Sequence, residues 1–370
     1  MAAVKAIGLM SGTSFDGVDV ALVETDGERI EALGPTGYRP YSDEERALLR
    51  QALAEGAALN DRISRPGVLA KADAFVTRIH AETVEKFMAD EQIARDDVGI
   101  VGFHGQTVIH KPDAKLTVQI GDGAALARRL RLPVAYDFRQ NDITAGGQGA
   151  PIVPVFHQAM ARDLARPHPI AVLNIGGVAN VTFVDGGEPV ACDTGPGNAL
   201  IDDFMRARTG APYDDHGDVA ATGKPNLPFI ARVLEHKFFE LKPPKSLDRN
   251  AFAFGNIGLP EFSVPDGAAT LSLLTVEAVG RVLAHLPEKP RAWVVAGGGA
   301  RNRTLMRMLG EKLAPATVET ADDAGWSADA LEAQAFAFLA VRTLRGLPLT
   351  FPTTSGAPKP LPGGLVVNPA

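Results

Sequence analysis

Apolar residues recur along the chain at the spacing of amphipathic helices. Between residues 67 and 88 they return every three or four positions, which predicts a helix with one apolar face. His80, Glu82 and Lys86 fall between these positions, so we expect their side chains to be solvated. The same spacing predicts helices over residues 43–58 (capped by Asp43), 124–130, 268–286, 303–313 and 328–345.

Short apolar runs predict strands over residues 98–103, 134–138 and 293–296. Residues 7–23 read as a strand, a glycine-rich turn and a second strand, and residues 170–184 repeat that pattern. In both halves a helix, a strand and a glycine turn then follow in the same order. The repeat is far too long for a solenoid. It indicates an α/β protein made of two duplicated lobes with a cleft between them.

Composition and charge narrow this picture. A chain of 370 residues is long for a single core, which favours two domains. The net charge of -7 argues against a nucleic-acid partner. The single cysteine, Cys192, excludes an intrachain disulfide and a cysteine-rich metal site. No apolar run reaches the roughly 18 residues needed to span a bilayer, so we expect a cytoplasmic protein without a membrane partner.

The turn at residues 11–17 combines glycines, hydroxyls and a carboxylate. Glycine lets the backbone approach a ligand closely. Successive backbone N–H groups and the hydroxyls of Ser11, Thr13 and Ser14 can then cradle a phosphate. Asp16 can hold a magnesium ion, directly or through its waters, because that cation takes oxygen ligands. An ordinary glycine-rich hairpin turn is the alternative.

A second candidate site lies where a strand ends at Asp193 and runs through a Gly-Pro-Gly turn into a helix. A helix N-terminus presents N–H groups and a partial positive charge, which suits a phosphate beside Gly195 and Gly197. Asp193 is placed to act as a general base. The alternative is that it only caps the helix. No partner that would activate Cys192 is visible, so we expect a buried small residue there.

Other glycine turns follow strands near residues 176 and 298. None of them matches the phosphate-binding loop of P-loop enzymes, which excludes that class, and none reads well as a dinucleotide fingerprint. Residues 146–149 are glycine-rich and predict a hinge or a substrate loop.

Three polar residues are candidates for substrate contact. His104 and Gln106 follow the strand at 98–103, at the end where open α/β sheets place ligands. A structural histidine is the alternative at position 104. Glu332 lies on an otherwise apolar helix, so its carboxylate faces either solvent or the cleft.

These motifs, in this order, resemble the sugar kinase/actin superfamily and, within it, the anhydro-N-acetylmuramic acid kinases. The likeness spans nearly the whole chain. One loop departs from the family pattern, because residues 245–250 lack the Thr-Gly that more often follows Lys-Ser and the Glu that more often follows the Arg. The likeness is carried by residues 10–19, 105–107, 137–139, 146–151, 174–177, 193–198 and 297–302 together with Glu332.

The resemblance implies actin/ribonuclease-H-like lobes with mixed sheets flanked by helices. The first lobe is expected over residues 1–140, the second over 141–349, with the tail at 350–370 returning to the first. It also implies a bacterial enzyme of cell-wall recycling. Such an enzyme converts 1,6-anhydro-N-acetylmuramic acid, ATP and water to N-acetylmuramic acid 6-phosphate and ADP, with Mg²⁺. A homodimer is the oligomeric state expected from the family.

The same likeness assigns roles to residues. Asp193 is expected to activate the water that attacks the anomeric carbon, and Glu332 matches the family's substrate-contacting glutamate. The residue chemistry described above is the ground for expecting Asp16 to bind the metal and His104 and Gln106 to contact the sugar. The residues expected around ATP are Gly12, Thr13, Ser14, Phe15, Asp16, Gly17, Val18, Asp19, Gly176, Gly195, Gly197, Gly297, Gly298 and Asn302.

Two other functions stay open at this point. One is a kinase of the same fold that acts on a plain sugar hydroxyl, which Asp193 would deprotonate directly. The other is a sugar-binding regulator or actin-like assembly protein that binds ATP without transferring phosphate. No helix-turn-helix pattern precedes residue 7, which weakens the regulator. The presence of Asp193 weakens a catalytically inactive version.

Overall fold

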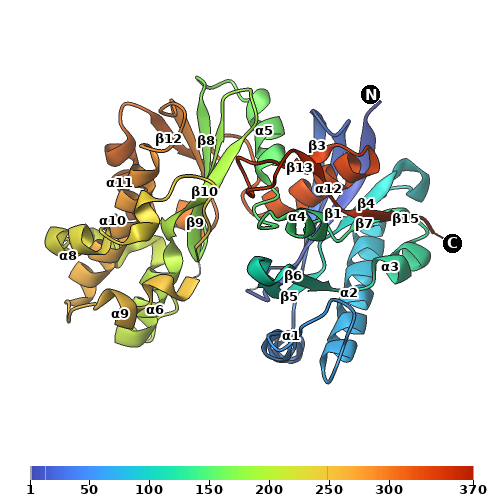
Figure 1. Cartoon of the computed structure of the whole chain (residues 1–370), viewed down its shortest axis with the longest axis horizontal. Helices are drawn as coiled ribbons and strands as arrows, with labels where there is room; N and C mark the ends of the chain where they lie inside the picture. The colour runs from blue at the N-terminus through green and yellow to red at the C-terminus, as the bar shows by residue number, and fades with distance from the viewer. Residues whose placement is uncertain (1, 13, 248, 370) are drawn as a thin grey trace. The chain divides into compact units, whose positions relative to one another are not determined.

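The computed structural model describes residues 2–12, 14–247 and 249–369. The backbone forms two compact units (Figure 1). Unit 1 contains the chain up to Met160 and again from Asp329 onward, whereas unit 2 is Ala161–Ala328. Each unit has its own sheet and its own hydrophobic core. No helix of the described ranges is both long and apolar enough to cross a membrane.

Unit 1 holds a six-stranded mixed sheet and two separate two-stranded sheets, β5-β6 and β13-β14, with helices around them. Its strands are β1 (Val4–Met10), β2 (Gly17–Thr25), β3 (Ile30–Pro40), β4 (Ile100–Phe103), β5 (Gln106–Lys111), β6 (Leu116–Ile120), β7 (Val134–Tyr136), β13 (Pro348–Thr350), β14 (Leu361–Pro362) and β15 (Leu365–Val367). Its helices are α1 (Asp43–Gly56), α2 (Leu69–Asp90), α3 (Gly123–Leu130), α4 (Gln140–Ala145), α12 (Leu331–Leu344) and most of α5 (Pro154–Arg162).

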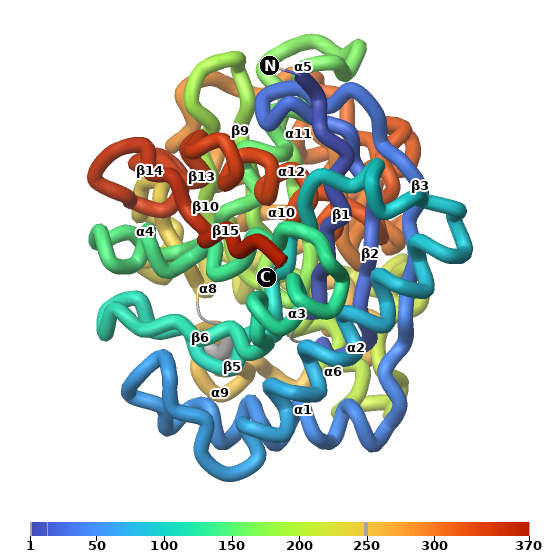
Figure 2. Tube along the Cα trace, turned by 90° about the vertical axis from the view of Figure 1, so that its right-hand side faces the viewer, coloured from blue at the N-terminus to red at the C-terminus, as the bar shows by residue number. Residues whose placement is uncertain are grey.

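The strand order of this sheet is β15-β7-β4-β1-β2-β3. β1, β4 and β7 run parallel, and β1, β2 and β3 form an antiparallel meander that Figure 2 shows side by side. β15, close to the C-terminus, adds antiparallel to β7. The C-terminal tail therefore contributes a strand to unit 1.

Helix α12 packs directly on the sheet of unit 1. A Cβ added at Gly8 of β1 would lie 1.9 Å from the Ala333 carbonyl oxygen, and one added at Gly102 of β4 would lie 2.1 Å from that of Phe336. The two glycines thus let the helix backbone rest on the strands. This contact places residues 331–344 in unit 1, whereas motif order assigned them to the second lobe. The first crossing between units falls near residue 160 instead of 140.

Unit 2 repeats the same plan. Its strands are β8 (Ile170–Ile175), β9 (Val178–Val184), β10 (Val190–Pro196), β11 (Ala292–Ala296) and β12 (Thr317–Thr320), and its helices are α6 (Asn198–Thr209), α7 (Asp218–Ala221), α8 (Leu227–Val233), α9 (Phe254–Ile257), α10 (Val264–Val282) and α11 (Arg303–Leu313). The strand order β10-β9-β8-β11-β12 matches β3-β2-β1-β4-β7, because corresponding strands follow one another in the same order along the chain and pair in the same parallel or antiparallel sense. The predicted α/β class with duplicated units and mixed sheets is confirmed.

Two local predictions were wrong. His80 is fully buried, because α2 turns a broad face inward and the imidazole packs edge-on against Phe103 at 5.0 Å between ring centroids. Its Nδ1 lies 2.7 Å from the Val76 carbonyl oxygen. The N-cap of α1 is Ser42, one residue before the expected Asp43: Ser42 accepts a hydrogen bond from the Glu45 N–H, and the Glu45 carboxylate accepts one from the Ser42 N–H.

Candidate active site

Hydrogen bonds among buried polar side chains support the turn after β1. Ser11 donates a hydrogen bond to Gln106 Oε1 at 2.7 Å, and its hydroxyl lies 2.9 Å from that of Tyr41. Gln106 Nε2 donates to the Gly12 carbonyl oxygen at 3.2 Å. Gln106 is fully buried. Each end of its amide makes a bond within unit 1, so this residue supports the turn.

The predicted phosphate turn exposes only part of its residues. Ser14 and Asp16 face solvent, whereas Phe15, Gly17 and Val18 are buried. Phe15 takes a left-handed backbone conformation, with φ of 58°. Thr13 lies outside the described residues. The exposed part of the turn therefore offers a hydroxyl and a carboxylate to a ligand.

Carboxylates gather beside this turn. Burial raises the pKa of Asp19 to about 7, and the negative charges of Glu332, Asp329 and Asp16 add to the rise. Among the described residues no group of three or more His, Cys, Asp or Glu side chains has the spacing of a protein-only metal site. Mg²⁺ commonly binds through one or two carboxylates plus substrate phosphates. The carboxylates present fit that second arrangement, because a divalent cation would relieve their mutual repulsion.

His104 and Arg139 form a fixed pair at the end of β4. His104 is buried, and its Nδ1 lies 2.9 Å from the Gly105 carbonyl oxygen, so Nδ1 carries the proton. Its Nε2 then accepts from Arg139 Nε at 3.3 Å and Nη2 at 3.1 Å. Burial and the Arg139 charge hold the histidine pKa well below its usual value. Both ring nitrogens are used, so this neutral ring orients Arg139.

The Glu332 carboxylate interacts electrostatically with the Arg139 guanidinium group. Its side chain at the start of α12 is accessible to solvent. Desolvation by the surrounding protein atoms raises the pKa of Glu332, while the positive charge of Arg139 lowers it. Burial lowers the pKa of Arg139 to about 10, and the negative charges of Glu332 and Asp142 oppose that change. An accessible carboxylate and a guanidinium therefore stand together in unit 1.

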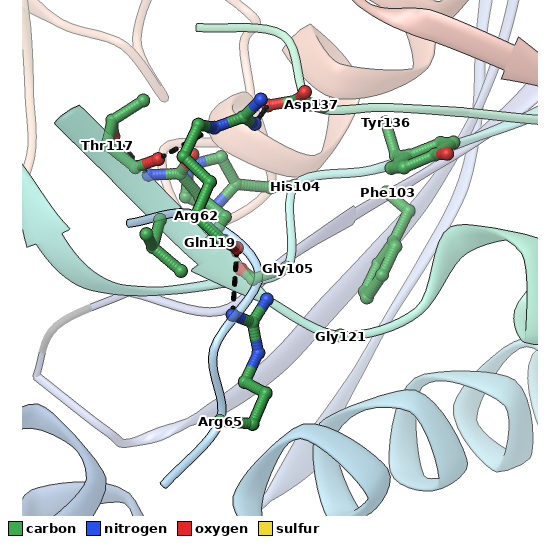
Figure 3. Close-up of a pocket in the computed structure, with 11 residues that line it drawn as sticks. Arg62, Arg65, Phe103, His104, Gly105, Thr117, Gln119, Gly121, Tyr136 and Asp137 are labelled. Carbon is green, nitrogen blue, oxygen red and sulfur yellow. Dashed lines mark hydrogen bonds and ion pairs between the residues drawn. The ribbon is translucent and has the colours of Figure 1, made fainter. Parts of the chain in front are cut away.

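A pocket of about 120 Å³ is lined in part by His104 (Figure 3). Arg62 donates to Asp137 at 2.6 Å at one end, Arg65 lies at the other, and the rings of Phe103 and Tyr136 line the side. Arg65 is also neutralised, by an ion pair with Asp73 outside the pocket. The pocket offers hydrogen bonds and an aromatic wall, with little net positive charge.

In unit 2, Asp193 lies at a bulge of β10 and is held in place by hydrogen bonds to the backbone of residues 245 and 247. Its Oδ2 accepts a hydrogen bond from the Leu247 N–H at 2.7 Å, and its own N–H donates to the Lys245 carbonyl oxygen at 2.9 Å. Burial raises the pKa of Asp193 to about 6, against the effects of the Leu247 hydrogen bond and the Lys245 charge. A carboxylate with this pKa is suited to accept a proton near neutral pH.

Two buried residues, Lys245 and Cys192, lie beside Asp193. Lys245 is buried, donates to the Phe238 carbonyl oxygen at 3.0 Å and lies over the Phe238 ring. Cys192 is buried as predicted, and burial raises its thiol pKa to about 12, which makes it unreactive. The departure from the family pattern lies in this loop, where Asp248 falls outside the described residues.

The glycine turns of unit 2 bond mainly to each other. The N–H groups of Gly197 and Ala199 donate to the Gly177 carbonyl oxygen, and that of Asn198 donates to the Gly176 carbonyl oxygen at 2.7 Å. These first N–H groups of α6 are therefore used within the protein, although the sequence suggested that they were free for a phosphate. The turns are locked against one another beside Asp193.

A pocket of about 290 Å³ lies next to these turns in unit 2. Gly298 and Asn302 line it, as does Tyr213, whose ring is 55% exposed. Asn302 also caps α11, since its Oδ1 accepts from the Leu305 N–H at 2.9 Å. The full lining is Asn198, Ile201, Asp202, Tyr213, Asp214, Asp215, His216, Gly298, Arg301 and Asn302.

Comparison with known proteins identifies the family. The family model described as anhydro-N-acetylmuramic acid kinase matches residues 4–368. The chain belongs to this family. It is 59% identical over 365 residues to the anhydro-N-acetylmuramic acid kinase of Rhodopseudomonas palustris (strain BisB18), covering 98% of this chain and 100% of that one. The enzyme of the same name from Nitrobacter winogradskyi is 58% identical, with 98% and 99% covered.

Solved structures are more distant from this member of the anhydro-N-acetylmuramic acid kinase family. The Acidaminococcus fermentans (R)-2-hydroxyglutaryl-CoA dehydratase component A is 12% identical, with a TM-score of 0.45 and coverage of 92% of this chain and 99% of that one. The fold assignment therefore rests on the strand orders of the two sheets and on family membership.

Within this anhydro-N-acetylmuramic acid kinase family member, unit 1 brings together the turn at 11–17, Asp19 and Glu332, and unit 2 brings together Asp193 with the turns near 176, 195 and 298. Sequence reasoning did not single out Arg139, Tyr213 or Lys245 as functional residues. Arg139 lies within the family-like segment 137–139, which was the one available signal.

Proposed function

We propose that this protein hydrolytically opens 1,6-anhydro-N-acetylmuramic acid and transfers the γ-phosphoryl group of ATP to its O6. The observation that carries the proposal is Asp193, a fixed carboxylate whose pKa of about 6 suits a general base. Family membership and the names of the relatives support the choice of sugar. The products are N-acetylmuramic acid 6-phosphate and ADP.

The reaction balances with one base. Asp193 takes a proton from water as the water oxygen bonds to C1 of the sugar. The bond between C1 and O6 breaks, and O6 bonds to the γ-phosphorus while ADP leaves. Asp193 then returns its proton to solvent. Such a transfer depends mainly on positioning and charge neutralisation, so the two fixed oxygens of one carboxylate are enough for the proton step.

For the nucleotide, we propose that the exposed turn around Ser14 and Asp16 meets the phosphates. The pocket beside Gly298 and Asn302 is the candidate for the nucleoside, with the exposed Tyr213 ring as a stacking surface. Asp16 and Asp19 are the residues that would hold Mg²⁺ with the phosphates. A bound Mg²⁺ neutralises the charge that develops on the phosphoryl oxygens.

For the sugar, we propose that the accessible Glu332 carboxylate accepts hydrogen bonds from hydroxyls and that Arg139 donates to ring substituents. His104 then acts through Arg139, and Gln106 through the turn it supports. The direct contacts expected for His104 and Gln106 stay predictions. A cytosolic role in cell-wall recycling and a homodimer are further parts of the proposal that rest on family membership.

The test measures ADP release with 1,6-anhydro-N-acetylmuramic acid, ATP and Mg²⁺ in ¹⁸O-labelled water. We expect one ¹⁸O at C1 and the phosphate on O6. In Asp193→Asn we expect turnover to fall by about 10³-fold, within the range for loss of a general base. Asp185→Asn, an exposed carboxylate of the same unit, is the matched control and should turn over normally.

Other outcomes of this test point elsewhere. Phosphate transfer to ordinary hexoses or N-acetyl sugars without ¹⁸O at C1 would favour a plain sugar kinase. ATP binding without ADP release with any sugar would contradict an enzymatic function for the site.

A further inference from the structure

Asp142 is a buried carboxylate that holds a loop rather than a cation. It lies on α4 and is 2% exposed. Its Oδ1 accepts the Gly149 N–H at 2.6 Å and its Oδ2 accepts the Ser355 hydroxyl at 2.5 Å. Among the described residues it makes no ion pair. A buried carboxylate with this set of donors is a geometric anchor for the segments that supply them.

The second segment is the C-terminal tail of the chain. Ser355 is fully buried, and besides its bond to Asp142 its carbonyl oxygen accepts the Gln148 N–H at 2.8 Å. The Gly147 N–H donates to the Asp142 carbonyl oxygen at 2.9 Å. The glycine-rich loop at 146–149 is therefore bonded to α4 through Gly147 and Gly149 and to the tail through Gln148.

The loop in turn fixes Arg139. Arg139 Nη1 donates to the Gly149 carbonyl oxygen at 2.9 Å, while Nε and Nη2 contact His104. A guanidinium group has five N–H donors in a rigid plane. Contacts with two different partners set the orientation of this plane, and they use three of the five donors among the described residues. The two backbone groups of Gly149 thus link the anchor to the guanidinium group, because its N–H bonds to Asp142 and its carbonyl oxygen to Arg139.

We propose that Asp142 and Ser355 are positioning residues for Arg139, acting through the backbone of Gly149, whose N–H bonds to Asp142 and whose carbonyl oxygen bonds to Arg139. The C-terminal tail thereby takes part in arranging the sugar side of the site, although Ser355 touches no ligand itself. The catalytic consequence of this arrangement rests on the function proposed above, whereas the arrangement of Arg139 itself does not.

The first experiment reads the position of Arg139 without any turnover. Imidazole ¹⁵N spectra of the full chain report whether His104 Nε2 accepts a hydrogen bond. Arg139→Met should move this resonance toward that of an unbonded ring nitrogen. Asp142→Ala should reproduce the movement and Ser355→Ala a smaller one in the same direction. Asp142→Asn, which keeps an acceptor for the Gly149 N–H, should stay near the wild-type position.

Ser272→Ala is the matched control for loss of a buried hydroxyl. Ser272 is buried in unit 2, and its hydroxyl has no hydrogen-bond partner among the described residues. This variant should leave the His104 signal unchanged. A His104 signal at its wild-type position in folded Asp142→Ala, with a moved signal in Arg139→Met, would overturn the proposal.

The second experiment is a double-mutant cycle on kcat/KM with the anhydro sugar. Asp142→Ala should lower kcat/KM about 10-fold in the wild-type background and cause no further loss in Arg139→Met, because residues that act as one unit are not additive. Losses that multiply would overturn a role through Arg139. If the wild type does not turn over the sugar, the proposed function fails, and the ¹⁵N spectra still decide the arrangement.

Discussion

At the scale of single residues, burial decides which side chains carry charge. His104 is neutral because burial and Arg139 disfavour its cation, and its protonated Nδ1 faces a carbonyl oxygen. Asp193 sits near its point of half-protonation at about pH 6, since burial outweighs the Leu247 hydrogen bond and the Lys245 charge. Burial thus sets the protonation state of each of these groups within its own unit.

The pKa of Asp193 predicts an acid limit of activity. A general base must be ionised, so kcat/KM should fall below an apparent pKa of about 6 as the pH is lowered. The measurement is kcat/KM for the anhydro sugar from pH 5 to 8 at saturating ATP. A kcat/KM that stays constant down to pH 5 would contradict the assignment, because an aspartate with the usual pKa of 3.8 is still ionised there.

Stability supplies a check of the same pKa that does not need turnover. The pKa of Asp193 is higher in the folded than in the unfolded chain, so the folded state binds its proton more tightly. The ionised carboxylate therefore costs stability above about pH 6, and this cost is relieved as the pH falls from about 6 to about 4. Asp193→Asn should raise Tm at pH 7.5, and the difference should shrink over that window. An unchanged difference would count against the raised pKa.

At the scale of elements, the turns beside Asp193 depend on close backbone approach. A Cβ added at Gly197 would lie 2.3 Å from the Gly176 carbonyl oxygen, whereas one added at Gly310 within α11 meets nothing within 4 Å. Position 197 must lack a side chain for β8, β9 and α6 to meet, whereas the glycine at position 310 only lowers the helix propensity of α11.

The two glycines therefore predict opposite effects of the same substitution. Gly197→Ala should lower the free energy of unfolding by about 1–3 kcal/mol, as overpacking does, and reduce kcat/KM. Gly310→Ala should raise the free energy of unfolding by about 0.5–1 kcal/mol with normal activity. Urea titration of both variants checks the pair. Equal stability of Gly197→Ala and wild type would show that the turns can move apart.

At the scale of the whole molecule, the two units repeat one topology but carry different chemistry. Unit 1 contains the accessible turn and the acidic residues, and unit 2 contains Asp193 and the pocket beside Gly298. The proposed function assigns a ligand-binding role to residues of each unit. Hydrogen exchange can test this assignment for each unit separately.

We expect a non-hydrolysable ATP analogue to slow amide exchange in both units. Protection should appear at residues 14–17 in unit 1 and at 298–302 in unit 2, because backbone groups near a bound nucleotide open less often. The exposed turn at residues 185–187 should exchange at the same rate with and without the analogue. Protection confined to unit 2 would contradict phosphate binding at the first turn.

The sequence by itself determined the features that depend on neighbours in the chain. Helical spacing located α2, α10 and α11, and glycines after apolar runs located the turns at 11–17 and 297–299. The order of these motifs was enough to recognise the duplicated α/β plan and the family. Such features arise from local periodicity and turn chemistry, which a sequence displays directly.

Only the tertiary structure decided which distant segments meet. The return of α12 to unit 1, the burial of His80 and the bond between Asp142 and Ser355 join residues that no local pattern relates. It also showed that the first N–H groups of α6 are already bonded. Burial, hydrogen-bond partners and pKa values depend on every element packed around a group, so they exist only once the chain has folded.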